Sequence, residues 1–152
     1  MATVTRTIGA SAEQVYAILA DGWTYSDWVV GTAHIRDVDA SWPEPGSQLH
    51  HKVGPWPLSI KDKSTVTAAE PGRALALRAG LWPYGEAFVR ITLEPTGRSE
   101  TRVTMHEDFQ AGPLLWLRNK INDLILHGRN VEALRRLAEL AEHSRHTASS
   151  QR

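Results

Sequence analysis

The sequence predicts an α+β domain in which a curved antiparallel sheet of seven strands wraps around one long C-terminal helix. Three observations predict this architecture. Apolar residues recur at steps of three and four from about residue 114 to 142, which gives one apolar stripe on a long helix. Seven strand-like runs precede it, and the short turns between successive runs favour antiparallel pairing. The chain of 152 residues has the length of one domain that can bury its own core.

The first two elements are a strand and a capped helix. Residues 3–8 alternate threonine with valine, arginine and isoleucine, as expected of a half-buried strand. Ser11 is followed three residues later by Gln14, a capping box that predicts the start of a helix. Apolar residues through Leu19 give this helix a buried face, and residues 23–29 are expected to add one more helical turn.

Six further strands complete the predicted sheet. Proline and glycine cluster in the loops between them, as in the turn Glu70-Pro71-Gly72. The strands are expected at residues 32–39, 47–53, 58–69, 73–81, 86–94 and 101–109.

The last predicted element is a helix from about Leu114 to Glu142. Its roughly 28 residues would span about 42 Å, so it needs a large partner surface, and only the sheet can supply one. Gly128 within the stripe indicates either close packing of the sheet or room for a ligand. Residues 143–152 are polar and lack periodicity. We therefore expect one domain over residues 1–142 and a disordered tail over 143–152. The predicted stripe consists of Leu117, Ile121, Leu124, Gly128, Val131, Leu134, Ala138 and Ala141.

Composition and charge argue against several classes of protein. The 17 basic and 17 acidic residues give a formal net charge of zero, whereas nucleic-acid binders usually carry a basic surplus. Cysteine is absent, which removes disulfides and thiolate chemistry. No run of 18 apolar residues occurs, and residues 1–10 lack the apolar centre of a signal peptide. We expect a cytoplasmic protein that neither binds nucleic acid nor spans a membrane.

The sequence contains no motif for metal or nucleotide chemistry. His50 and His51 are neighbours in a predicted strand, so they face opposite sides and cannot hold one metal together. There is no His-x-x-x-His pair, no Gly-x-Ser-x-Gly elbow, no P-loop and no Gly-x-Gly-x-x-Gly motif. We therefore expect no metal site and no other cofactor.

Strand alternation places a carboxylate on the apolar face of the last strand. Glu107 shares that face with Val103, Met105 and Phe109, so it is expected to point toward the long helix. A carboxyl group in a dry cavity can serve as a general acid. The alternative interpretation is a structural ion pair or a hydrogen bond to nearby backbone.

A histidine and an aspartate are expected on the same inner face. If the turn comprises residues 54–57, Leu49 lies opposite Asp62 and His51 lies diagonal to it. The two groups are then either a satisfied polar pair or a pair that orients a ligand or transfers protons. A slip of the register would turn them to solvent.

Tryptophan is unusually frequent, with six residues in the chain. Large rings can close the core and hold hairpins, or they can line an apolar ligand pocket. Both interpretations stay open for Trp23, Trp28, Trp42, Trp56, Trp82 and Trp116.

The order of elements and several short motifs resemble the START/Bet v 1-like superfamily (SRPBCC), and within it the bacterial polyketide cyclase/dehydrase-like group. The resemblance runs from Thr3 to Glu142. It implies a helix-grip fold with a deep cavity between sheet and long helix, which receives an apolar or amphipathic small molecule. The motifs are Ser11 to Asp21 with Trp28 following, Trp42 to Gly46, Glu107 followed by Gly112-Pro113, and Arg129 to Leu134.

Members of this superfamily include lipid carriers, hormone receptors and aromatic polyketide cyclases. The cyclases are expected to steer a poly-β-ketone with arginine, tyrosine and tryptophan side chains in the pocket. This chain offers Trp28, Arg73, Trp82 and Tyr84 near plausible cavity mouths. No set of residues in it matches a cyclase catalytic set residue by residue.

The function that we expect is therefore the binding of a lipid-like or aromatic metabolite in that cavity. Apolar residues would supply contact area, while the ionisable ones would fix orientation. An alternative is an enzyme of the cyclase/aromatase or dehydratase type, in which Glu107, or His51 with Asp62, transfers protons. A third is an interaction domain whose cavity is filled by side chains. The expected lining residues are Trp28, His51, Asp62, Tyr84, Met105 and Glu107.

Overall fold

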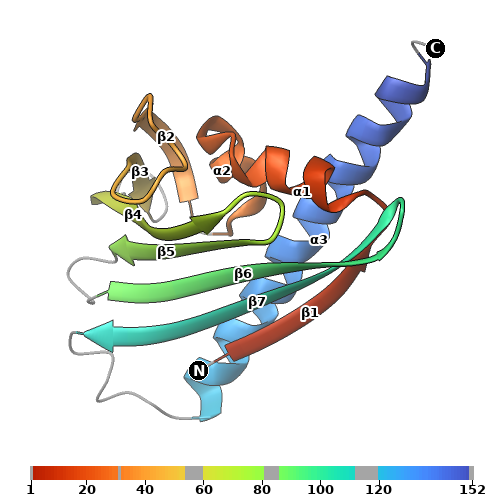
Figure 1. The fold of residues 1–152 in the computed structure, drawn as a ribbon. Coiled ribbons are helices and arrows are strands. Elements are labelled where there is room, and N and C mark those ends of the chain that lie inside the picture. The colour runs from red at the N-terminus through yellow and green to blue at the C-terminus, as the bar shows by residue number, and fades with distance from the viewer. Residues whose placement is uncertain (1, 31, 54–59, 81–85, 112–119, 151–152) are drawn as a thin grey trace.

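The computed structural model describes residues 2–30, 32–53, 60–80, 86–111 and 120–150. Within these residues it contains seven strands, two α-helices of eight residues or more, and two short helical turns (Figure 1). In chain order the elements are β1 (Ala2–Ile8), α1 (Ala12–Leu19), the 3₁₀ turn η1 (Gly22–Thr24), α2 (Tyr25–Trp28), β2 (Thr32–Val38), β3 (Gln48–Val53), β4 (Ile60–Glu70), β5 (Ala74–Gly80), β6 (Glu86–Gly97), β7 (Glu100–Ala111) and α3 (Lys120–Ser150).

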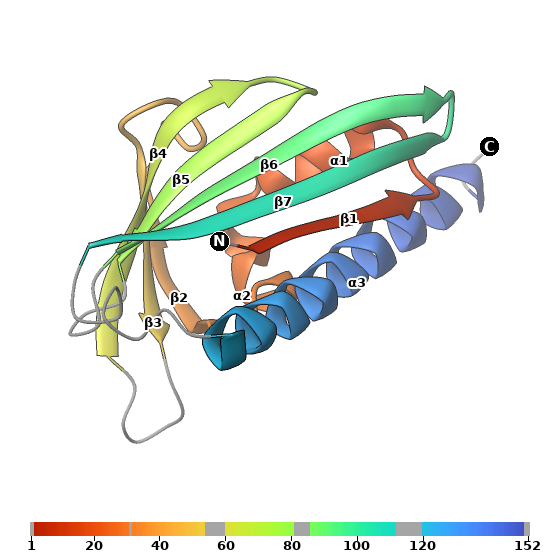
Figure 2. The same cartoon turned by 90° about the horizontal axis from the view of Figure 1, so that it is seen from below.

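All seven strands belong to one antiparallel sheet, in the order β1-β7-β6-β5-β4-β3-β2. Strands β2 to β7 follow one another as hairpins, and β1 adds to the free edge of β7. The sheet is bent, and α3 runs along it (Figure 2). Helix α3 packs against β1, α1 and α2. This arrangement confirms the predicted α+β helix-grip fold.

The core lies between the inner face of the sheet and the helices. The second half of α3 buries Leu134, Leu137, Ala138 and Ala141 completely or almost completely. Each large apolar side chain removed from water contributes about 1.5–3 kcal/mol, so this half of α3 is held mainly by packing. The sheet and α1 supply the opposing surface with Val15, Leu19, Val66, Leu75, Ile91 and Val103.

The predicted capping box of α1 is confirmed. The Gln14 backbone N–H donates to Ser11 Oγ at 3.2 Å, and the Ser11 N–H donates to Gln14 Oε1 at 3.0 Å. The box satisfies two backbone donors that the start of a helix otherwise leaves unpaired, and it fixes where α1 leaves β1.

The C-terminal helix is longer than predicted. Helix α3 continues to Ser150, so the disordered tail predicted for residues 143–152 is wrong as far as that residue. Residues 143–150 contain no proline or glycine that would stop a helix. Once a helix is nucleated by packed residues, each further residue adds one hydrogen bond without a new nucleation cost. The predicted start of the helix at Leu114 lies outside the described residues.

The hairpin of β3 and β4 has a different register from the predicted one. His51 lies directly opposite Asp62, and Leu49 lies opposite Ser64. The prediction assumed a turn of residues 54–57, whereas the paired residues flanking the turn are Val53 and Ile60. Since the shift is two residues, all side chains keep their faces, and His51 and Ser64 are both buried.

Candidate functional site

A cavity opens between the sheet, α2 and α3. Most of its described lining is apolar and comes from the middle of the sheet, where Leu77, Ala87 and Val89 face inward. The polar lining residues come from five different elements, α2, β3, β4, β7 and α3. In addition to those three, the described lining consists of Tyr25, Trp28, Val29, Val30, His51, Ser64, Ala79, Gly80, Met105, Glu107, Arg129, Asn130 and Ala133.

Two volumes describe the size of this cavity. The enclosed part has a volume of about 60 Å³, and the atom-free space including open solvent at the mouth is about 640 Å³. The enclosed part is smaller than an apolar cavity of roughly 150 Å³ that holds benzene. A ligand with an aromatic ring would therefore extend into the mouth of the cavity.

An ion pair between sheet and helix forms one wall of the cavity. Arg129 Nη2 on α3 donates to Glu107 Oε1 on β7 at 2.7 Å. The Glu107 side chain is only 4% exposed, whereas the Arg129 side chain is 33% exposed. Glu107 thus lies inside with its charge balanced, and Arg129 reaches it from the edge of the cavity. This arrangement supports the ion-pair interpretation of Glu107 rather than the general-acid one.

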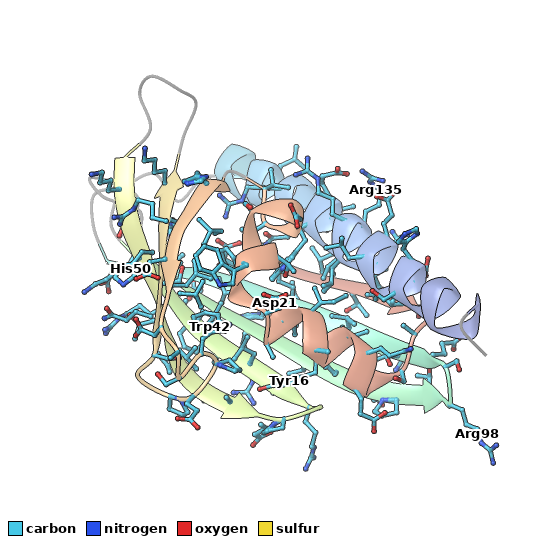
Figure 3. All side chains as sticks on the ribbon, turned by 90° about the horizontal axis from the view of Figure 1, so that it is seen from above. Tyr16, Asp21, Trp42, His50, Arg98 and Arg135 are labelled. Carbon is cyan, nitrogen blue, oxygen red and sulfur yellow. The ribbon has the colours of Figure 1, made fainter. Side chains whose placement is uncertain are left out.

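His51 of β3 is buried against α2 and β4. Its Nε2 and the Ser64 hydroxyl form a hydrogen bond of 3.1 Å, and the Tyr25 ring stacks on it with 6.2 Å between ring centres. Burial lowers the pKa of His51 to about 4, although the nearby Asp62 carboxylate opposes this shift. The imidazole is therefore neutral at pH 7. The neighbouring His50 points to the outer side of the sheet, as predicted (Figure 3).

Tyr25 links the aromatic part of the wall to the polar part. Its ring meets the Trp28 ring edge to face, with 5.3 Å between centres. Burial raises the pKa of the Tyr25 hydroxyl to about 12, opposed in part by a hydrogen bond with the Ser64 side chain. Tyr25, Ser64 and His51 thus form an uncharged polar group at neutral pH.

Three buried polar atoms of the lining have no hydrogen-bond partner in the part of the chain that the structure describes. They are Trp28 Nε1, His51 Nδ1 and Asn130 Nδ2. A buried polar group without a partner costs about 1–3 kcal/mol. All three side chains line the same cavity, and the three atoms themselves have almost no exposed surface.

Four of the six predicted lining residues lie in the described lining. Trp28, His51, Met105 and Glu107 do so, whereas Tyr84 lies outside the described residues. The prediction that Asp62 lines the cavity is corrected, because Asp62 is not among the described lining residues. A Cβ added at Gly80 would overlap the Asp62 carboxylate, so this carboxylate lies against the backbone of β5. Asp62 Oδ1 also accepts a hydrogen bond from the Lys63 N–H at 2.8 Å.

The sequence interpretation missed several polar residues of the lining. Ser64 is in step with the inward residues of β4, which was a usable signal. Tyr25 precedes Trp28 by three residues in one helical turn, so the two share a face. The apolar stripe predicted for the long helix contains neither Arg129 nor Asn130. Their place beside Glu107 depends on how α3 crosses the sheet, which local sequence does not encode.

The three described tryptophans have different roles. Trp28 is buried and lines the cavity. Trp42 is also buried, and its indole Nε1 donates to the Leu19 carbonyl at 3.2 Å, so it fastens the β2–β3 connection to α1 (Figure 3). Trp23 is exposed. Both sequence interpretations are therefore needed, and Trp56, Trp82 and Trp116 lie outside the described residues.

Two kinds of feature are absent from the described part of the chain. No group of three or more histidine and acidic side chains there is close enough to hold a metal ion. No helix in the same residues is both long and apolar enough to cross a bilayer.

The fold and the cavity define a helix-grip domain of the START/Bet v 1-like kind. In sequence, residues 1–142 match the family described as polyketide cyclase/dehydrase and lipid transport, and the chain belongs to this family. The predicted resemblance is thereby confirmed. No curated protein matches the chain in sequence.

Solved structures share this fold at low sequence identity. The Zhui aromatase/cyclase from Streptomyces sp. R1128 is 17% identical, with a TM-score of 0.71 over 92% of each chain. A protein from Nitrosomonas europaea is 17% identical, with a TM-score of 0.70 over 94% of each chain. The di-domain ARO/CYC StfQ from the steffimycin biosynthetic pathway is 11% identical, with a TM-score of 0.66 over 93% of this chain and 50% of that one. These identities show a common fold and no more.

Proposed function

We propose that this protein binds a small, mostly apolar molecule in the cavity between the sheet and α3. The observation that carries this proposal is the combination of an apolar wall with three buried polar atoms that have no partner in the described protein. Polar atoms placed sparsely in an apolar pocket are typical of sites that orient a ligand. The family description, which includes lipid transport, and the aromatase/cyclase neighbours support this proposal.

In this proposal the two kinds of wall have separate roles. The apolar residues of β5, β6 and β7 supply contact area, at about 25 cal/mol for each Å² removed from water. His51, Trp28 and Asn130 fix the orientation, because a ligand that pairs with them removes the cost of their burial. Glu107 contributes to the polar part of the wall through its ion pair with Arg129.

The first test is native mass spectrometry of the full chain purified from its own host, which identifies a co-purified ligand directly. The affinity of that ligand is then measured for His51→Ala and Glu107→Gln. We expect both substitutions to weaken binding by about tenfold or more, since each changes a buried polar group of the wall.

The matched control is His50→Ala. His50 is the neighbour of His51 on the same strand, but it faces the outer side of the sheet and does not line the cavity. We expect this variant to bind as the parent does. Unchanged affinity in both His51→Ala and Glu107→Gln would contradict the orienting role.

A second candidate function is an enzyme of the cyclase/aromatase or dehydratase type. The favouring observation is the neutral His51, a side chain of the cavity lining whose Nδ1 has no hydrogen-bond partner among the described residues. Its lowered pKa of about 4 predicts a rate that is constant near neutral pH and falls as the pH drops through about 4. This acid limb should be lost in His51→Ala and kept in His50→Ala. If the protein binds carbonyl-rich molecules but converts none of them, the enzyme proposal is wrong and only the binding proposal remains.

A further inference from the structure

We propose that one face of α3 is a contact surface between two copies of this chain, which pair through their α3 helices in antiparallel orientation. The residues Leu124, Gly128, Val131 and Arg135 form this face, the outer seam of α3. All four are exposed, and Arg135 projects away from the sheet (Figure 3). The inference concerns assembly and does not depend on what the cavity binds.

Apolar side chains gather on the outer seam. Among the described residues, three large apolar side chains are exposed, and two of them, Leu124 at 70% and Val131 at 42%, lie on this face. Single exposed apolar residues are normal on a protein surface, whereas exposed apolar residues that share a face indicate a contact surface. From Leu124 to Arg135 the seam residues follow at steps of four, three and four. This alternation is the spacing by which one helix packs along another.

Gly128 is the residue of the seam that a single chain does not explain. A glycine within a helix costs about 1 kcal/mol relative to alanine. The φ angle of Gly128 is not positive, and nothing lies within 4 Å of a Cβ built on it, so neither the backbone nor the packing of one chain requires glycine here. The bare backbone lets a side chain of another helix approach closely.

A second copy of the same seam fits this gap. In a two-fold dimer, residue i of one copy contacts residue j of the other, and j contacts i. When an antiparallel pair is centred midway between Gly128 and Val131, each Val131 lies opposite the partner's Gly128. Each Arg135 then lies opposite the partner's Leu124, where its methylene stem can cover the leucine while its guanidinium stays in water.

The charges beside the seam permit this pairing. Arg135 pairs with Glu132 and Glu139, and Arg136 pairs with the same Glu132. Two arginines and two glutamates thus cancel within each copy, so two copies do not repel each other. The antiparallel register also brings Glu132 opposite His127, an exposed side chain whose ring N–H can donate to a carboxylate. A parallel pair would instead bring Arg135 opposite the partner's Arg135.

The apolar part of the seam is short, so the dimer should be weak. It covers about two turns of α3, and one pair of helices buries less than the roughly 1,600 Å² of a standard interface. We expect a dissociation constant on the order of 10–100 µM.

Sedimentation equilibrium of the full chain, from well below to well above this concentration, measures the association. We expect the mean mass to rise from that of the monomer toward that of the dimer. Val131→Glu buries a charge against the partner's Gly128 and should weaken the association at least about tenfold. The matched control is Trp23→Glu, which makes the same replacement at the third exposed large apolar residue, on η1, and should leave the association unchanged.

Gly128→Gln separates association from folding, because the two expected effects have opposite signs. Glutamine is a better helix former than glycine and the position is open, so the monomer should unfold at a higher urea concentration when it is measured well below the dissociation constant. The new side chain occupies the place of the partner's Val131, so the association should weaken at least about tenfold.

Single cysteines test the register, since the chain has no cysteine of its own. Chains with Gly128→Cys and chains with Val131→Cys are mixed in equal amounts and oxidised, and mass spectrometry counts mixed and like disulfides. The antiparallel register predicts mixed disulfides well above the half that random pairing gives, whereas a parallel register predicts like ones.

Three results would overturn the inference. The first is a chain that stays monomeric at the highest concentration. The second is a dimer whose affinity is unchanged in both Val131→Glu and Gly128→Gln, because such a dimer forms through another surface. The third is an excess of like disulfides, which contradicts the antiparallel arrangement.

Discussion

Two neighbouring histidines show how strongly a single residue depends on the face of its strand. His50 and His51 are consecutive in β3. The His50 ring lies near solvent, with 3.9 Å between its Nε2 and Asp39 Oδ1. The His51 side chain is 3% exposed and lies among Tyr25, Ser64 and the cavity. The alternation of a strand, which the sequence already predicts, thus separates a surface histidine from one that stays neutral inside the protein.

The buried histidine predicts a loss of stability in acid. Its pKa is about 4 in the folded protein and about 6.5 in the unfolded chain. The unfolded chain therefore binds more protons between these values, and stability falls as the pH drops from about 6.5 to about 4. The contribution of His51 to the free energy of unfolding should decrease by about 2 kcal/mol between pH 7 and pH 5.

Urea unfolding at the two pH values measures this effect. His51→Asn lacks the titrating group, so its stability should fall by about 2 kcal/mol less than that of the parent. The stability of His50→Asn should fall by as much as that of the parent, since His50 is not buried in the core. If the stability of the parent and of His51→Asn depends equally on pH, then His51 has the same pKa in the folded and in the unfolded chain, and the prediction is wrong.

At the scale of elements, α3 shows what a periodic pattern predicts and where it fails. The predicted stripe is correct in the second half of the helix, where Leu134, Ala138 and Ala141 are buried. In the first half, Leu124 is 70% exposed and Val131 is 42% exposed, and nothing lies within 4 Å of a Cβ added at Gly128.

The geometry of the helix explains this failure. The stripe steps by three residues from Gly128 to Val131 and again to Leu134. Each step of three falls about 60° short of a full turn of 3.6 residues per turn. Two such steps move Gly128 well away from the face that packs on the sheet. Asn130 and Ala133 occupy that face instead, and both line the cavity.

The corrected face of α3 predicts different costs for two substitutions one turn apart. Leu134 is completely buried, so Leu134→Ala should lower the free energy of unfolding by about 2–5 kcal/mol. Val131 belongs to the same predicted stripe but is 42% exposed, so Val131→Ala should change the free energy of unfolding by less than about 0.5 kcal/mol. Chemical denaturation of the two variants measures both values. A comparable loss in both would support the stripe predicted from the sequence over the packing described here.

For the molecule as a whole, the sequence predicts the fold better than the site. The strands, the capping box at Ser11 and the long helix follow from local patterns that tertiary packing reinforces. The inward orientation of His51 and Glu107 follows from alternation. The partners of these residues do not, because Arg129 and Tyr25 reach the cavity only through the way α3 and α2 cross the sheet. Asp62 was assigned correctly to a face but lies against Gly80 instead of the cavity.

The ion pair that joins sheet and helix makes a prediction about the whole molecule. Glu107 on β7 is almost completely buried, whereas Arg129 on α3 is one-third exposed. Arg129→Gln leaves a buried carboxylate without its counter-charge, so it should lower the free energy of unfolding by about 3 kcal/mol. Glu107→Gln should cost about 1 kcal/mol or less, because the Arg129 guanidinium can turn to water.

The double variant distinguishes this asymmetry from a simple loss of contacts. If the main cost of Arg129→Gln is the stranded carboxylate, then adding Glu107→Gln removes that carboxylate and should restore about 2 kcal/mol. Guanidinium unfolding of the parent, both single variants and the double variant at pH 7 measures the cycle. A double variant less stable than Arg129→Gln alone would mean that Glu107 stabilises the sheet independently of α3.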